Sequence, residues 1–244
     1  MKYIALFILI VVAFSFQMKG VAQESIGVNN TGSSDWNNDS LDISISYYDK
    51  FTPIIGGKEV RKRNGVIVNG VVKDYYPDST LKHRGYYTQG KLITSYKNYY
   101  PSGVLERSYT MSGTFKVVIR SFYPIGTPKE YIEFRKDVIV KYIDYYPNGN
   151  IATLEEHDKK KGFYTIYKNY YPSGVLKSSL ELRNRKKREY FQVEYYSSGK
   201  IKEEGAVVYN QYYYDYQRYG IWNIFDEKGK LIESQEYYKG ELVQ

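Results

Sequence analysis

The chain has 244 residues, a formal net charge of +8, 25% charged residues and no cysteine. The lack of cysteine excludes disulfide bonds, thiolate metal sites and cysteine nucleophiles, so the fold depends on packing alone. Tyrosine is unusually frequent, with 31 copies against 3 methionines and 2 tryptophans. Because tyrosine favours strands, this composition predicts a mostly β protein.

The N-terminus has the pattern of a secretory signal peptide. Lys2 precedes an apolar run over residues 3–16, and a polar stretch then ends in Gly20-Val21-Ala22. Small residues at this place favour cleavage between Ala22 and Gln23. The run is shorter than the roughly 20 residues that a spanning helix needs, which favours cleavage over an uncleaved anchor. We therefore expect export to the periplasm, the cell surface or the medium, with residues 1–22 removed.

Two segments lie between this signal and the main part of the chain. Residues 23–43 are rich in Gly, Ser and Asn, which is typical of a flexible linker. Residues 44–69 carry no copy of the motif that fills the rest of the chain. We expect them to form an N-terminal cap on an array of repeats over residues 70–244.

The array is defined by a recurring motif of two aromatic residues, proline, a small polar residue and glycine, which we call the anchor. The decapeptide YKNYYPSGVL occurs identically at Tyr96–Leu105 and Tyr167–Leu176. The proline position of the anchor falls at residues 77, 101, 124, 147, 172, 197 and 227, mostly 23–25 residues apart. Such a period is typical of repeat proteins in which each repeat packs on its neighbours.

Each anchor is predicted to form the tip of a β-hairpin. Proline suits the first corner of a type I turn, and glycine then adopts the left-handed conformation that closes the hairpin. Ser79 replaces glycine in the first anchor, so we expect a strained turn or one of another type. Pro128 predicts an edge or a bulge after the third anchor. The predicted turn residues are Pro101, Gly103, Gly126, Pro147, Gly149, Pro172, Gly174, Gly199 and Gly229.

The segments Tyr219–Val243 and Lys160–Gly205 resemble the MORN-repeat variants of bacterial proteins, with a glycine, an aromatic residue, a tyrosine pair and a lysine-rich turn. The resemblance extends over about residues 70–240. It implies an all-β fold, an elongated array of stacked β-hairpin repeats of about 23–25 residues each. It also implies contacts with proteins, self-association or contacts with membrane lipids, and this variant family often has an antitoxin label.

Two aromatic rows precede the prolines, and adjacent strand residues point to opposite faces of a sheet. The first row is aromatic in every anchor, so we assign it to the core: Tyr75, Tyr99, Phe122, Tyr145, Tyr170, Tyr195 and Phe225. The second row becomes Asp226 in the last anchor. We assign this row to an exposed face that binds a partner: Tyr76, Tyr100, Tyr123, Tyr146, Tyr171 and Tyr196. A further apolar set three residues before the first row, beginning with Val72 and Tyr96, fits this alternation only if a bulge intervenes.

The densest basic stretches are Lys58–Arg63 and Arg183–Arg188. Such stretches bind phosphates or an anionic membrane surface, or they form solvated turns that prevent aggregation of strand edges. Five residues of the second stretch are retained as candidate binding residues: Arg183, Arg185, Lys186, Lys187 and Arg188.

No catalytic motif is present. The two histidines, His83 and His157, lack partners at metal-ligand spacing and are expected at the surface. The neighbouring carboxylates Glu155 and Glu156 should point to opposite faces of a strand, which prevents joint acid/base catalysis. No nucleophile elbow, zinc-protease or phosphate-loop motif occurs. We therefore expect a protein that is not an enzyme and needs no cofactor and no metal.

The leading interpretation is an exported, non-catalytic binding or scaffolding repeat protein of the cell envelope. Its expected partner is an envelope protein or glycan, with an anionic membrane surface and self-association as further options, and export argues against nucleic acid. One alternative is an antitoxin-like protein that neutralises a toxin partner, which conflicts with the signal peptide. Another is an envelope glycan hydrolase, for which the sequence shows no acid/base pair.

Overall fold

The computed structural model describes residues 60–113, 115–136 and 138–243, all within one structural unit. The predicted signal peptide, the linker and residues 44–59 of the predicted cap lie outside the described residues. Every regular element in the described part is a β-strand: β1 (Lys62–Arg63), β2 (Val66–Ile67), β3 (Gly70–Tyr75), β4 (Leu81–Thr88), β5 (Lys91–Tyr99), β6 (Leu105–Ser112), β7 (Lys116–Phe122), β8 (Pro128–Arg135), β9 (Val138–Tyr145), β10 (Ile151–His157), β11 (Tyr164–Tyr170), β12 (Leu176–Asn184), β13 (Glu189–Tyr195), β14 (Ile201–Asn210), β15 (Asp215–Phe225), β16 (Leu231–Tyr238) and β17 (Glu241–Leu242).

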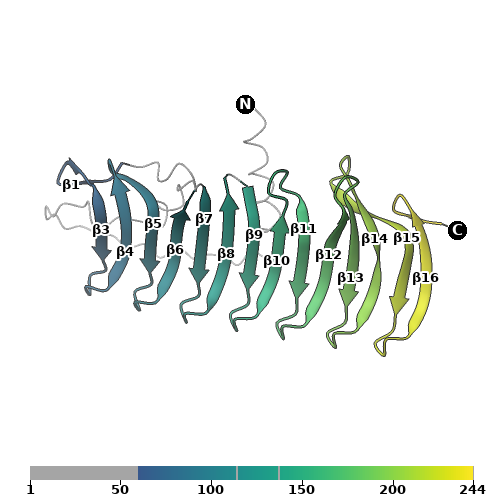
Figure 1. Ribbon diagram of the computed structural model, residues 1–244. Helices are drawn as coiled ribbons and strands as arrows, with labels where there is room; N and C mark the ends of the chain where they lie inside the picture. Colours follow the sequence, from purple (N-terminus) through teal and green to yellow (C-terminus); the bar gives the residue numbers. More distant parts are fainter. Residues whose placement is uncertain (1–59, 114, 137, 244) are drawn as a thin grey trace, which may run out of the picture. The chain divides into compact units, whose positions relative to one another are not determined.

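The strands β3 to β17 form a single sheet of 15 antiparallel strands (Figure 1). Their order across the sheet is their order along the chain, so each strand pairs with the strand before it and the strand after it. The small strands β1 and β2 form a separate pair. The prediction of an all-β array of successive hairpins is confirmed. In such an array the contacts are local in sequence, and each hairpin depends mainly on its two neighbours.

The anchors form the hairpin tips along one end of the strands (Figure 1). In the fifth anchor, the Gly174 amide donates to the Tyr171 carbonyl at 2.8 Å and the Tyr171 amide donates to the Val175 carbonyl at 2.8 Å. Gly174 has a φ of 88°. The same pair of hydrogen bonds closes every anchor turn, and the six anchor glycines all have positive φ. The predicted turn chemistry is confirmed.

Two anchors depart from the consensus without changing the turn. Ser79 adopts a φ of 69°, and its amide donates to the Tyr76 carbonyl at 2.9 Å. The turn therefore has the same hydrogen bonds as the other anchor turns. The expected strain is present, because a non-glycine residue rarely adopts a left-handed conformation. Pro128 pairs with Phe122 at a register shift inside the sheet, so this position is a bulge and not an edge.

Exposure alternates along the first strands and defines two faces. On β3, Val72 and Asp74 are buried, whereas Val71, Lys73 and Tyr75 are exposed. We call the face of Val72 and Asp74 the inner face and the face of Lys73 the outer face. Cross-strand register then assigns the residues of the other strands to one face or the other.

The assignment of the first aromatic row to the core is wrong. Tyr75 is 52% exposed, and the other six members of that row are only partly buried. The buried positions lie three residues earlier and so on the opposite face, with Val72, Tyr96 and Trp222 at 5%, 3% and 0% exposure. Every member of the first row is aromatic, and each pairs across the hairpin with the residue that follows the turn, as Tyr99 does with Leu105.

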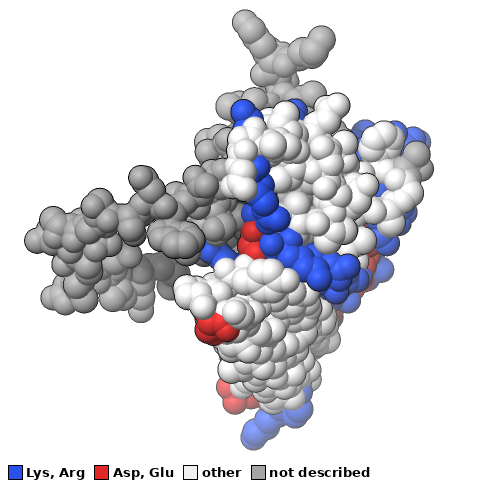
Figure 2. All heavy atoms as spheres, turned by 90° about the vertical axis from the view of Figure 1, so that its left-hand side faces the viewer, with Lys and Arg blue, Asp and Glu red and all other residues white. Residues whose placement is uncertain are grey.

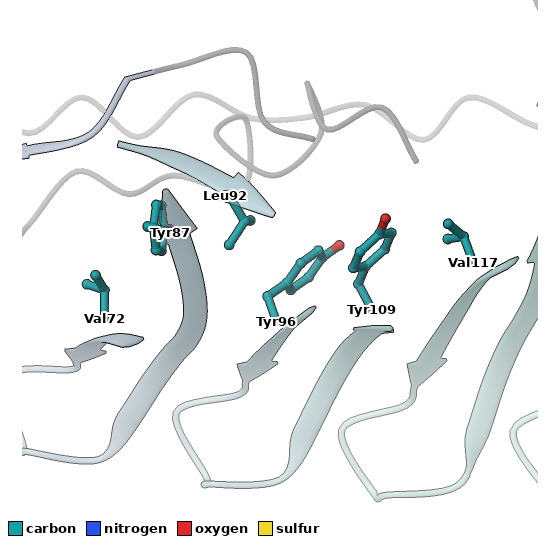
Figure 3. Close-up of a cluster of buried hydrophobic side chains, with 6 residues drawn as sticks. All are labelled: Val72, Tyr87, Leu92, Tyr96, Tyr109 and Val117. Atoms are coloured by element: carbon teal, nitrogen blue, oxygen red, sulfur yellow. The ribbon is translucent and has the colours of Figure 1, made fainter. Parts of the chain in front are cut away.

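The buried apolar side chains form two clusters. The cluster near β3 contains Val72, Tyr87, Leu92, Tyr96, Tyr109 and Val117, and these side chains stand on the same side of the sheet (Figure 3). The Tyr96 and Tyr109 rings stack with their centroids 5.4 Å apart. The cluster near β15 contains Leu180, Tyr190, Val207 and Trp222. Apolar burial is therefore concentrated toward the two ends of the sheet.

The described part of the predicted cap, residues 60–69, contacts the turn between β4 and β5. The Arg61 amide donates to the Gly90 carbonyl at 2.8 Å, and the Gly90 amide donates to the Val68 carbonyl at 2.9 Å. The buried Arg61 guanidinium forms a bidentate ion pair with Asp74 on β3. These bonds fasten residues 60–69 to the first two hairpins, and the capping role stays a prediction.

Candidate functional site

The second aromatic row joins each hairpin to the next one. The Tyr171 hydroxyl donates to the Tyr195 carbonyl of the following hairpin at 3.0 Å. The equivalent bond recurs at every junction between anchors: Tyr76 to Tyr99, Tyr100 to Phe122, Tyr123 to Tyr145, Tyr146 to Tyr170 and Tyr196 to Phe225. We call these six bonds the tyrosine latches. Each fastens a side chain of one repeat to the backbone of the next.

The seventh anchor carries aspartate in place of the second-row tyrosine. Asp226 Oδ1 accepts the backbone amides of Lys228 and Lys230 at 2.9 and 2.8 Å. A short acidic side chain that bonds its own turn is typical of such positions. Asp226 therefore stabilises its own turn, whereas the second-row tyrosines bond the following hairpin.

The prediction that the second row is exposed is wrong, because all six tyrosines are partly buried. Burial also raises the pKa of the Tyr76, Tyr100 and Tyr123 hydroxyls above the usual value. Their hydroxyls have partners in the neighbouring repeat, so the row has a structural role. A binding role for the ring faces stays a prediction.

Most of the predicted basic turn, Arg183–Arg188, is engaged within the protein. The Arg185 guanidinium forms an ion pair with the buried Asp158 carboxylate. The Arg188 guanidinium lies over the Phe163 and Tyr209 rings, at 5.1 and 5.3 Å from their centroids. Arg183 lies 3.8 Å from Glu181, and Lys187 lies 3.5 Å from Glu189. Lys186 alone of the five candidate residues has no charged or aromatic partner in the described part of the chain.

A shallow hollow of about 550 Å³ lies beside this turn. Its lining includes Lys141, Glu156, His157, Asp158 and Arg185. Lys141 contacts Glu156 at 3.1 Å and Arg185 pairs with Asp158, whereas Lys159 and Lys160 of the lining make no ion pair with a described residue. The hollow therefore combines paired and unpaired charges.

The inner face carries a polar row, one residue per strand, beside the apolar clusters. His83 is fully buried there, with Nδ1 2.7 Å from Asn98 Oδ1, and burial lowers the pKa of His83 to about 4. The expectation that His83 lies at the surface is therefore wrong, because register places it on the inner face opposite Asn98.

Other ionisable groups make contacts that follow from the face of the sheet on which each residue lies. Partly buried His157 contacts Glu155 at 3.0 Å, whereas Glu156 contacts Lys141 on the outer face. The prediction that Glu155 and Glu156 point to opposite faces is confirmed. Sequence inspection did not detect the cross-strand neighbours Glu130 and Asp144. Burial raises the pKa of both carboxyls.

The outer face carries a cationic row that sequence inspection missed. Lys73 on β3, Arg84 on β4 and Lys97 on β5 are direct cross-strand neighbours, and all three are exposed. The same row continues through Ser108 to Arg120 on β7. We call Lys73, Arg84, Lys97 and Arg120 the cation row. In Figure 2, which looks onto the β3 end of the sheet, Lys and Arg side chains gather in a band.

The cation row differs from the basic turn in lacking internal counter-charges. No member makes an ion pair with any residue that the structure describes; Arg120 only lies over the Tyr131 ring, 5.3 Å from its centroid. Asp74 is the sole acidic residue in the sequences of β3, β4 and β5, and it is buried on the inner face against Arg61. A periodic signal was present, since Lys73, Lys97 and Arg120 each lie four residues before an anchor proline position.

Within residues 60–113, 115–136 and 138–243, no group of three or more His, Asp or Glu side chains is placed to hold a metal ion. The same part of the chain has no helix with the length and apolar character of a membrane span.

Comparison with known proteins gives one family match. The family model of the MORN repeat variant matches residues 165–184, which comprise most of β11, the fifth anchor and β12. No curated protein matches the chain. Among solved structures, a mutant of S. aureus TarM in complex with Fondaparinux, alpha-GlcNAc-glycerol and UDP is similar with a TM-score of 0.28 and 11% identity, over 46% of this chain and 20% of the other. That likeness is too weak to support an inference. The resemblance to MORN repeats is confirmed: the chain carries a MORN repeat variant at residues 165–184, in the middle of a sheet of like hairpins.

Proposed function

We propose that this protein is an exported, non-catalytic binding or scaffolding protein of the cell envelope. The observation that carries the proposal is the outer face of the sheet near β3, where exposed cations lie in register without counter-charges in the described residues. Like charges directly opposite each other on a sheet are destabilising. An arrangement that weakens the fold and is open to solvent is better accounted for by a partner than by packing.

The array itself supports a scaffolding role. The tyrosine latches repeat one hydrogen bond at each junction, which fixes the spacing of neighbouring hairpins. A partner would therefore meet a preorganised surface and would not have to order it, which lowers the entropic cost of binding. Export rests on the sequence of residues 1–22, with Lys2, an apolar run and a small-residue ending at Ala22.

The proposal is tested by cell fractionation combined with cross-linking in intact cells. We expect the full chain to be processed to begin at Gln23, to fractionate with the envelope and to cross-link there to an envelope component. A chain lacking residues 2–22 is the control, and it should stay in the cytoplasm and give no such product. Recovery of the full chain in the cytoplasm with Met1 retained would contradict export, and an envelope-located chain without cross-linked products would contradict the binding role.

A further inference from the structure

We infer that the cation row binds a linear acidic polysaccharide laid across the strands β3 to β7. This inference deepens the proposed function, on which it rests, by naming the chemical class of the envelope partner. It starts from the register of the sheet, because Lys73, Arg84 and Lys97 occupy consecutive strands at directly paired positions.

The shape of the charged surface favours a linear polymer. Strands in a sheet lie about 4.8 Å apart, so the four steps from Lys73 on β3 to Arg120 on β7 cover roughly 19 Å. On β3 the row is flanked by the apolar and aromatic side chains of Val71 and Tyr75. A polyanion running perpendicular to the strands would meet Lys73, Arg84 and Lys97 on three consecutive strands, pass over the buried Ser108 on β6, and then meet Arg120.

The residues beside the row favour a polymer of sugar rings. Tyr75 and Tyr86 lie on the outer face on opposite sides of the row, and they are 52% and 43% exposed. Exposed aromatic rings supply flat, amphipathic area to a partner at a small cost in side-chain entropy. Tyr131, which is partly buried, lies beneath the Arg120 guanidinium at the far end of the row. Cations that bind carboxylate, sulfate or phosphate groups, with tyrosines beside them that pack on sugar rings, match an acidic polysaccharide.

Charge complementarity is strongest at this end of the sheet. Farther along the same row, Tyr131, Ile143 and Leu154 replace cations, and the next cation, Lys168, is paired with Glu181. The positive row is thus confined to β3–β7. Electrostatic attraction of a polyanion to such a row is long-ranged and screened by salt.

The experiment measures binding of the purified protein to polygalacturonate and dextran sulfate, with neutral dextran as the uncharged probe. The test variant combines Lys73→Gln, Arg84→Gln and Lys97→Gln. The matched control combines Arg183→Gln, Lys186→Gln and Lys187→Gln, which removes the same charge from the basic turn. We expect the test variant to lose about tenfold or more in affinity at moderate salt, because it removes three adjacent charge contacts. The control should lose less than about threefold.

A second pair of measurements separates sugar recognition from charge alone. The double variant Tyr75→Ala and Tyr86→Ala should weaken binding to both polysaccharides several-fold, while binding to poly-glutamate changes little. Circular dichroism of each variant verifies that the sheet is intact. Equal losses in the two triple variants would overturn the inference, as would binding to phosphatidylglycerol vesicles or single-stranded DNA with none to the polysaccharides.

Failure of this inference can be distinguished from failure of the proposed function. A chain that reaches the envelope and cross-links there, but binds no acidic polysaccharide through the cation row, removes the inference and leaves the function. If the purified chain binds through the cation row but the cellular protein stays in the cytoplasm, the proposed function is removed and binding by the row is kept.

Discussion

Lys97 and Lys168 occupy the same position in their repeats, four residues before the anchor proline, but their surroundings differ. The Lys168 ammonium lies 2.9 Å from Glu181, and this hydrogen bond raises the pKa of Lys168. Lys97 lies between Arg84 and Ser108 and has no ion pair among the described residues. At the end of the sheet near β3 the cations face solvent, whereas farther along they are neutralised by the protein itself.

An internal counter-charge separates structural charges from candidate binding charges in this repeat array. The period places a lysine at both positions, so its presence alone says nothing about function. The presence or absence of an internal counter-charge distinguishes a structural cation from a candidate binding cation. By this criterion the dense basic turn at Arg183–Arg188 is largely structural, since Arg185 and Arg188 have partners in neighbouring hairpins. The dispersed cation row is the better candidate for a binding surface.

The largest expected effect is a loss of stability when a glycine beside either buried cluster is replaced by alanine. A β-carbon at Gly205 would lie 2.4 Å from Trp222 Cδ2, against a rigid ring. A β-carbon at Gly85 would lie 2.5 Å from Leu92 Cδ1 and 2.6 Å from His83 Nε2, which are side-chain ends. We expect Gly205→Ala to lower the free energy of unfolding by about 3 kcal/mol, and Gly85→Ala by less, because Leu92 can rotate away and only the His83 ring then has to shift.

Urea unfolding in a Trp36→Phe background provides the measurement, since Trp222 is then the sole tryptophan and reports on its own cluster. Circular dichroism follows the sheet as a whole. Equal losses in the free energy of unfolding would contradict the expected difference between the two clusters.

The next effect is a pH dependence of the end near β3. Burial lowers the pKa of His83 to about 4, whereas an unfolded histidine titrates near 6.5. Above pH 6.5 the residue is neutral in both states, so its contribution to stability is complete. Between pH 6.5 and about 4 the unfolded state alone takes up the proton, and stability should fall by at most about 3 kcal/mol.

The comparison of the wild type with His83→Gln isolates this histidine from the carboxylates that titrate nearby. The free energy of unfolding of the wild type should fall more steeply over that range than that of the variant. Amide exchange, corrected for intrinsic rates, should place the difference in β3–β5 and not in β13–β15. Parallel pH profiles for the two proteins would contradict the burial of a neutral His83.

The tyrosine latches should contribute equally at both ends. Tyr171→Phe removes one hydroxyl that donates to the Tyr195 carbonyl and should cost about 1 kcal/mol. The neighbouring hydroxyl of Tyr170 makes no hydrogen bond with the described residues, so Tyr170→Phe should be nearly neutral. Thermal unfolding checks this ranking, with Tyr76→Phe and Tyr196→Phe as tests near each end. A larger loss of stability from Tyr170→Phe than from Tyr171→Phe would show that the first row, and not the second, has the structural role.

The smallest expected effect tests whether Lys168 and Lys97 differ in their contribution to stability. Lys168→Gln should cost about 0.5 kcal/mol, because it breaks a partly exposed ion pair with Glu181. Lys97→Gln should be neutral or stabilise by a few tenths of a kcal/mol, because it relieves repulsion from Arg84. Chemical unfolding at low salt measures both, and high salt should abolish the difference. Destabilisation by Lys97→Gln would reveal an internal role for that cation.

The hairpins could be predicted from sequence because their chemistry is local. Proline, a small polar residue and glycine within five positions determine the turn, and the glycine φ of 88° at Gly174 follows from that order. The faces were harder to predict, since both aromatic rows fit a strand. The invariance of the first row reflects pairing across the turn, and Asp226, the exception in the second row, bonds its own turn.

The candidate binding surface escaped prediction because its members are distant in sequence. Lys73, Arg84 and Lys97 become neighbours only through register, and no local density of charge marks them. The latches escaped for a similar reason, because the acceptor of the Tyr171 hydroxyl is a backbone carbonyl in the next repeat. Export and the flexible linker concern residues outside the described part and stay predictions.

The tyrosine latches also make the array modular at the level of the gene. Every internal junction offers the same donor and the same acceptor, so a shorter array would still find its bonds wherever two anchors meet. Unequal crossing-over between the identical decapeptides at Tyr96–Leu105 and Tyr167–Leu176 would delete 71 residues, since equivalent positions are 96 and 167. That deletion removes three whole hairpins and leaves Tyr100 in the sequence context of Tyr171, with the Tyr195 carbonyl as its acceptor. Length variants of this protein are therefore expected to differ by whole hairpins.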